Sequence, residues 1–227
     1  MYDSTNNVDS SGNILPISSA SRDRKFVGDT SYAVVVDPRP TPSGQVIIYA
    51  AMSGPNGGIW RSEDTGKTWT LLLAGQATDV VLDRESGAVL NPATGTEVQG
   101  NLQVVYAAMR GTGVFMSPNQ GQVWNQMLGG IGNPLIFDSR FAPSPNVNPV
   151  NGPTPNGGQG RISLAVPNAT GNAAQDAVYE GWLYAIVSTP AGALDGIFVT
   201  KDFGQNWTEV RIQIGRASCR ERVLMPV

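Results

Sequence analysis

Histidine is absent from the 227 residues, and cysteine occurs only once, at Cys219. Without histidine the chain cannot build a Ser-His-Asp or Cys-His catalytic group, a zinc site held by imidazole, or a histidine pH switch. We therefore expect neither a metal nor a cofactor, and the sequence assigns no catalytic residue.

Charge and long apolar runs are also scarce. Charged residues make up 15% of the chain, with 15 Lys and Arg against 18 Asp and Glu, a formal net charge of −3. Because no basic run offers a surface for phosphates, we expect no nucleic-acid partner. No apolar stretch approaches the roughly 18 residues that cross a bilayer, so we expect no membrane span. The 27 Gly and 16 Pro beside 41% hydrophobic residues favour an all-β protein over a helical bundle.

The last residues differ in character from the rest. Residues 214–223 read IGRASCRERV, which resembles the translation of a sequencing-library adapter. We therefore expect 214–227 to be a non-native tail that contains Cys219, and the natural reading frame to continue beyond the cut.

A repeated pattern organises the chain. Each repeat has an apolar stretch containing Tyr-Ala, a glycine turn, a second apolar stretch, a polar turn, and a third stretch that begins at tryptophan. The repeats lie at 46–73, 103–128 and 181–210, and a β-branched run precedes each one, at 32–36, 79–83 and 161–166. Short β-branched runs bounded by Gly, Pro, Asn or Asp indicate strands, so each repeat is predicted to hold four of them.

Four antiparallel strands repeated in series are typical of propeller blades. We predict an all-β fold, a partial β-propeller of about three four-stranded antiparallel blades. The predicted divisions are a polar lead-in at 1–30, blades at about 31–76, 77–130 and 160–213, and a Pro/Asn/Gly-rich loop at 133–160. Because closed propellers have at least about four blades, three would leave sheet faces uncovered.

The polar turns read SEDTGKTW, SPNQGQVW and TKDFGQNW. They resemble the Asp-box, or bacterial neuraminidase repeat, in which Ser or Thr, Asp, Gly, Thr and Trp recur at fixed spacing. The matching positions are Ser62, Asp64, Gly66, Thr68 and Trp69 in the first turn, Ser117, Asn119, Gly121 and Trp124 in the second, and Thr200, Asp202, Gly204 and Trp207 in the third. The second turn departs from the pattern at Asn119 and Val123, and the third at Asn206.

Local turn chemistry explains these residues. Asp or Asn accepts hydrogen bonds from nearby backbone amides, glycine supplies a positive φ, and the hydroxyl closes the turn. Tryptophan buries a large area between blades. We therefore interpret Asp64 and Asp202 as structural rather than catalytic or metal-binding. The resemblance implies the same, since Asp-boxes in sialidase-like propellers are fold elements remote from the active site.

The resemblance extends to a broad superfamily that includes sialidases, xyloglucan-cleaving hydrolases, sortilin-type receptors and photosystem assembly factors. It implies a secreted or cell-surface location and ligands on the side away from the Asp-boxes. Strand alternation places the connections 84–101 and 167–180 on the Asp-box side. The charged candidates on the opposite side are Asp79, Arg110, Asp138, Arg140, Arg161 and Asp195; the alternative is that they are ordinary solvated loop charges.

Two functions fit these observations. The first is a fragment of an exported Asp-box propeller that acts as a structural or ligand-binding module, with a carbohydrate or a protein as ligand and further blades of the same chain as partners. The alternative is a fragment of a glycoside hydrolase that acts on polysaccharide or sialoglycan through Asp or Glu carboxylates, which needs no histidine. No carboxylate pair stands out, and Arg161-Ile162-Ser163 is not the Arg-Ile-Pro type of motif that a sialidase carries.

Overall fold

The computed structural model describes residues 10, 11, 13, 26, 28–83, 89, 90, 97, 98, 104–127, 160–168, 170 and 172–210. The predicted tail at 214–227 with Cys219, most of the predicted lead-in at 1–30, and the loop at 133–160 apart from Gly160 lie outside these residues.

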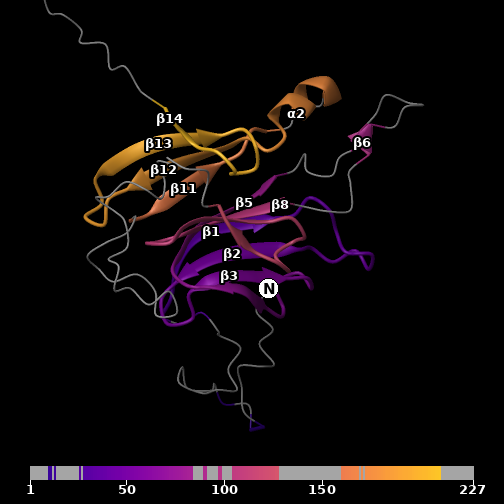
Figure 1. Cartoon of the computed structure of the whole chain (residues 1–227). Coiled ribbons are helices and arrows are strands. Elements are labelled where there is room, and N and C mark those ends of the chain that lie inside the picture. Colours follow the sequence, from indigo (N-terminus) through magenta and orange to yellow (C-terminus); the bar gives the residue numbers. More distant parts are fainter. Residues whose placement is uncertain are drawn as a thin grey trace, which may run out of the picture.

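Three four-stranded antiparallel sheets make up most of the described part of the chain, which is nearly all β as predicted (Figure 1). The first sheet has the order β1-β2-β3-β4, with bounds Thr30–Val36, Ile48–Ser53, Gly58–Ser62 and Thr70–Ala74. The second has the order β5-β8-β9-β10, with bounds Ala77–Asp83, Val104–Met109, Gly113–Ser117 and Asn125–Gln126. The third has the order β11-β12-β13-β14, with bounds Ile162–Ala165, Leu183–Ser188, Leu194–Thr200 and Thr208–Glu209.

These sheets are the blades of a partial β-propeller, numbered here one to three in chain order. The first strands of adjacent blades lie against each other, β1 against β5 and β5 against β11 (Figure 1). Blade two is covered by a neighbour on both faces, and its second strand β8 is accordingly a continuous apolar run, VVYAAM.

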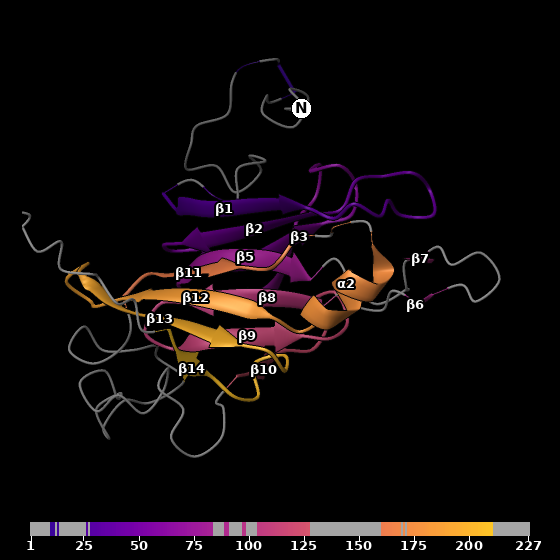
Figure 2. The ribbon, with the colours of Figure 1, turned by 90° about the horizontal axis from the view of Figure 1, so that it is seen from above.

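Two elements interrupt the connections on the Asp-box side. A two-stranded hairpin joins β6 (Val89–Leu90) to β7 (Glu97–Val98) within the connection 84–101. The connection 167–180 contains the short helix α2 (Ala173–Tyr179). The side chain of Asn172 caps this helix by accepting from the amides of Ala174 and Gln175. The helix and the hairpin lie at the same end of the blades (Figure 2).

Strand bounds differ from the predicted ones mainly at the fourth strand of each blade. The tryptophan predicted to begin that strand belongs to the turn, and the strand starts after it. In blades two and three only two residues pair, at β10 and β14. No helix in the part of the chain that the structure describes is long and apolar enough to span a membrane.

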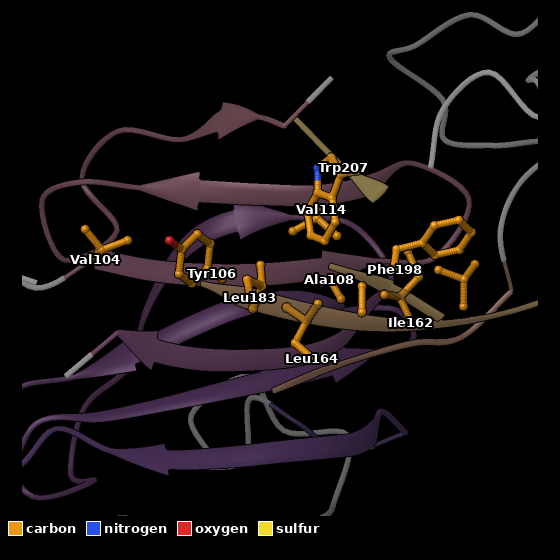
Figure 3. Packing of buried hydrophobic residues seen from close by; sticks show 11 residues of the cluster. Val104, Tyr106, Ala108, Val114, Ile162, Leu164, Leu183, Phe198 and Trp207 are labelled. Atoms are coloured by element: carbon orange, nitrogen blue, oxygen red, sulfur yellow. The ribbon is translucent and has the colours of Figure 1, made fainter. Parts of the chain in front are cut away.

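Buried side chains form a layer between each pair of adjacent blades. Between blades one and two the layer includes Tyr49, Ile59, Val80 and Val105. Between blades two and three it includes Tyr106, Val114, Leu164, Leu183, Phe198 and Trp207, which lie between the two sheets in Figure 3. A smaller cluster of Ala50, Met52 and Trp60 lies on the other face of blade one, against Phe26 and Trp69.

Candidate functional site

The first Asp-box turn is closed by its own side chains. Asp64 accepts hydrogen bonds from the Thr68 amide (2.8 Å) and hydroxyl (2.6 Å) and from the Ser62 hydroxyl (2.8 Å). The Ser62 hydroxyl in turn accepts from the Gly66 amide at 2.8 Å. Desolvation acts to raise the pKa of Asp64, but these hydrogen bonds outweigh it and lower the pKa to about 2. A carboxylate held so firmly in the ionised, acceptor-only form has no proton to donate near neutral pH.

The third turn repeats this arrangement with different donors. Asp202 accepts from the Asn206 amide (2.9 Å), the Asn206 side chain (2.7 Å) and the Thr200 hydroxyl (2.7 Å). Desolvation raises the pKa of Asp202 and the hydrogen bonds from Asn206 and Thr200 lower it, with lowering the net result. Asn206 therefore donates to Asp202 through its amide and its side chain, as Thr68 donates to Asp64 in the first turn.

The second turn shows that the charge is dispensable. The Asn119 side-chain oxygen accepts from the Val123 amide at 2.9 Å and from the Ser117 hydroxyl at 3.0 Å. The Gly121 amide donates to the Ser117 hydroxyl at 2.8 Å, as Gly66 does in the first turn. An amide oxygen thus makes the same turn as a carboxylate, as expected of a structural residue.

Each turn contains one feature that sequence reasoning missed. The residue before the glycine also has a positive φ: 64° at Thr65, 59° at Gln120 and 58° at Phe203. In the second turn this conformation presents the Gln120 carbonyl to the first blade, where it accepts from Arg61 at 2.6 Å and from the Tyr49 hydroxyl at 3.4 Å. The second Asp-box turn therefore also ties its blade to the preceding one.

On the opposite side, three of the six charged candidates come together with one tyrosine. Arg110, in the turn after β8, donates to the Tyr32 hydroxyl at 3.2 Å. The Arg161 guanidinium, just before β11, lies over the Tyr32 ring, 5.2 Å from its centroid. Arg161 also acts electrostatically on Asp79 in β5. We call Tyr32, Asp79, Arg110 and Arg161 the three-blade junction, since they come from all three blades.

Asp79 serves a structural purpose within the junction. Its carboxylate accepts from the Val80 amide at 2.9 Å and from the Leu164 amide of β11 at 2.8 Å. Burial raises the pKa of Asp79, while the two amides and the Arg161 guanidinium partly counteract that shift. Thr78 reinforces the link, because its hydroxyl donates to the Ile162 carbonyl at 2.9 Å and accepts from the Ile162 amide at 3.2 Å.

Local irregularities position Tyr32 and Thr78. The pairing of β1 with β2 shifts register between Ser31 and Ala33, so Tyr32 is the extra residue of a bulge. The pairing of β5 with β8 shifts between Ala77 and Asp79, which leaves Thr78 at the equivalent point. Bulges redirect side chains and are frequent beside binding sites. The apolar pattern of these strands carries no signal for the extra residue, and sequence reasoning did not assign Tyr32.

The other three charged candidates do not belong to the three-blade junction as the structure describes it. Asp195 lies half-buried in β13, at the end of blade three away from its Asp-box turn. Asp138 and Arg140 lie outside the described residues. Within the described ranges, no three acidic or cysteine side chains form a group that could hold a metal ion.

Blades of four antiparallel strands closed by Asp-box turns define a partial Asp-box β-propeller. The family described as the BNR-Asp box repeat matches residues 59–72, which include the first turn. Among solved structures, the chain is similar to a GH74 xyloglucanase from Xanthomonas campestris, with 16% identity and a TM-score of 0.24. The similarity covers 78% of this chain and 29% of that one, so the chain spans under a third of the enzyme's length. No curated protein matches the chain.

Proposed function

We propose that the chain is part of an exported Asp-box propeller that acts as a binding module, and that the three-blade junction binds a carboxylate-bearing carbohydrate. The observation that carries the proposal is that two guanidinium groups meet at one tyrosine. Arg110 donates to the Tyr32 hydroxyl, and Arg161 lies over the Tyr32 ring. Both arginines are exposed, and neither forms a salt bridge with a described carboxylate. Export is part of the proposal because polysaccharide ligands of this kind lie outside the cell.

The chemistry of the junction fits an acidic sugar better than a neutral one. A planar guanidinium matches a carboxylate with two parallel hydrogen bonds. The half-buried ring of Tyr32 offers an apolar surface on which the face of a pyranose can lie, with a hydroxyl already engaged by Arg110. A uronate-containing oligosaccharide meets both requirements.

Hydrolysis finds less support at this junction. Glycosidases of both stereochemical types need two carboxyl groups about 5 to 10 Å apart. Among the described junction residues Asp79 is the one carboxylate, and it already accepts from the amides of Val80 and Leu164. A binding role without turnover is therefore the better supported function.

Titration calorimetry with an oligogalacturonate tests the proposal, with a neutral xyloglucan oligosaccharide as the second ligand. We expect the acidic ligand alone to bind at low ionic strength, and Arg110→Ala and Arg161→Ala each to weaken it about tenfold or more, as loss of a charge-assisted hydrogen bond implies. Lys67→Ala is the matched control, because it removes an exposed positive charge from the Asp-box side. Equal binding of both sugars, equal binding by the arginine variants, or release of new reducing ends would contradict the proposal.

A further inference from the structure

The same tyrosine position has different surroundings in the three blades. Tyr49, Tyr106 and Tyr184 occupy it, since they pair with Arg61, Met116 and Val199, each of which comes one residue before the start of the Asp-box turn. Tyr49 and Tyr106 are 0% exposed, whereas Tyr184 is 38% exposed. The difference arises because blade two covers Tyr49 and blade three covers Tyr106.

Other positions on the same face of the sheets are likewise buried in blades one and two and exposed in blade three. We call the face turned toward the following blade the trailing face, and the face turned toward the preceding blade the leading face. Ala51 and Ala108, on trailing faces, are fully buried, whereas Ile186 at the same register position is 48% exposed. Trp182 occupies the position of the buried Val104. The trailing face of blade three is thus an inter-blade surface that no described part of the chain covers.

The leading face of blade one is its counterpart. Val34 pairs with Ala50 as Val80 pairs with Ala107, so the two valines are equivalent. Val80 is 0% exposed under blade one, whereas Val34 is 61% exposed. Phe26 covers only the part of this face where it meets Trp60 and Trp69, at ring distances of 5.2 and 5.5 Å.

The Asp-box glycines give an independent indication of the same open face. A Cβ on Gly121 would collide with Leu72 of blade one, and a Cβ on Gly204 would lie 2.7 Å from Met127, at the end of blade two. At Gly66 the nearest atoms belong to Ile48 and Trp69 of its own blade, at 3.7 and 4.0 Å. Among the described residues, none of another blade takes the place beside Gly66 that Leu72 and Met127 take beside Gly121 and Gly204.

We propose that the chain assembles head to tail, with the trailing face of blade three of one copy docked on the leading face of blade one of a second copy. These are the two kinds of face that the internal interfaces already join, so the contact repeats an interface that the sequence is built to make. A contact between different faces generates a ring if it closes. The described residues of two copies hold six blades, and two such contacts would join them in one ring, within the range of about four to eight blades that propellers adopt.

The aromatic group beside Tyr184 belongs to this interface. The centroid of the Trp182 ring lies 5.4 Å from that of Tyr179 and 6.5 Å from that of Tyr184. The Lys201 ammonium lies 4.1 Å from the centroid of the Trp182 ring. Exposed aromatics of this kind also serve as platforms for sugars. The register equivalence of Trp182 and Tyr184 with buried residues of the other blades favours a blade as the occupant.

Sedimentation velocity of the whole chain at tens of micromolar tests the assembly. We expect a dimer, and we expect both Ile186→Glu and Val34→Glu to raise its dissociation constant at least about tenfold, because each places a charge in one of the two apolar faces. Both side chains are about half or more exposed in the single chain, so the far-UV circular dichroism and the melting of the monomer should stay unchanged. Val123→Glu, at an exposed valine of the second Asp-box turn, is the matched control and should remain dimeric.

Mixing the two variants separates head-to-tail docking from symmetric pairing. The Val34→Glu copy keeps an intact trailing face and the Ile186→Glu copy keeps an intact leading face, so the mixture should regain one contact and associate again. A wild-type chain that stays monomeric would overturn the proposal, as would a dimer that Ile186→Glu alone disrupts. A monomer whose tryptophan fluorescence responds to a xyloglucan oligosaccharide would instead identify the aromatic group as a sugar platform. Oligomers larger than a dimer that both variants dissociate would support the head-to-tail contact.

Discussion

The carboxylate of Asp79 in β5 accepts a hydrogen bond from the amide of Leu164 in β11, 2.8 Å away. The two residues belong to different blades, which share no strand ladder. A side chain of one inner strand therefore satisfies a backbone amide of the next, and the hydroxyl of Thr78 does the same for Ile162. Polar groups thus join the inner strands of blades two and three, in addition to the apolar layer between the two sheets.

Replacing Asp79 tests this connection. Asp79→Ala leaves the Leu164 amide without its acceptor, so we expect a loss of about 1–3 kcal/mol in the free energy of unfolding, measured with urea. Hydrogen exchange at the Leu164 amide should accelerate as well. Glu209→Ala, which removes an exposed carboxylate from β14, should change stability by no more than about 0.5 kcal/mol. An unaltered exchange rate at Leu164 would show that the bond contributes nothing.

Acid should weaken the fold through the Asp-box aspartates. Their pKa values are lowered in the folded state, that of Asp64 from 3.8 to about 2, so their stabilising contribution is present above about pH 4 and is lost as the pH falls toward 2. Asp79 acts in the opposite sense, because its raised pKa favours protonation in the folded state.

Melting temperatures measured from pH 6 to pH 2 should therefore fall less steeply for Asp64→Asn than for the wild type, since the amide does not titrate. Identical slopes for the two proteins would refute the assignment of the acid sensitivity to Asp64.

Two glycines separate backbone strain from contact between blades. Gly66 and Gly121 both have a φ of 86°, so alanine costs about 1–2 kcal/mol of backbone strain at either position. A Cβ on Gly121 also collides with Leu72 of the preceding blade, while one on Gly66 meets only ordinary contacts. We expect Gly121→Ala to be the more destabilising by about 1–3 kcal/mol, the range for overpacking, in urea unfolding. Equal losses would mean that blade one yields freely at Leu72.

Tryptophans of the Asp-boxes should differ in their contribution. Trp207 is buried between blades two and three, whereas Trp69 is half-buried on the leading face of blade one. Trp207→Ala is expected to cost about 3–5 kcal/mol, the range for an aromatic core residue, and Trp69→Ala distinctly less. A larger loss of stability for Trp69→Ala than for Trp207→Ala would contradict this expectation.

The sequence predicts the blades well because their signals are local and repeated. Apolar runs around Tyr49 and Tyr106 and the spacing of Asp64 and Asp202 to their glycines recur in register, so the strands and turns can be aligned without coordinates. The positive φ of Gly66 also follows from the turn alone.

Features that depend on neighbouring blades were beyond this reasoning. The bulge at Tyr32 adds one residue to a strand without changing its composition, and the bonds that the Gln120 carbonyl accepts from Arg61 and Tyr49 come from another blade. Strand alternation predicts that Asp79, Arg110 and Arg161 lie on one side of the blades. It could not show that they meet at Tyr32, because that depends on how three sheets are arranged around their inner strands. The helix α2 was missed although Asn172 is a recognisable cap.

The central claim is that the Asp-box aspartates stabilise their turns and have no catalytic role. Urea unfolding of Asp64→Asn beside Asp64→Ala tests it most directly. Asn119 already forms the second turn with an amide oxygen. We therefore predict that Asp64→Ala lowers the free energy of unfolding by about 1–2 kcal/mol, and that Asp64→Asn lowers it by no more than half as much. Unfolding curves for both variants that coincide with the wild type would contradict the account.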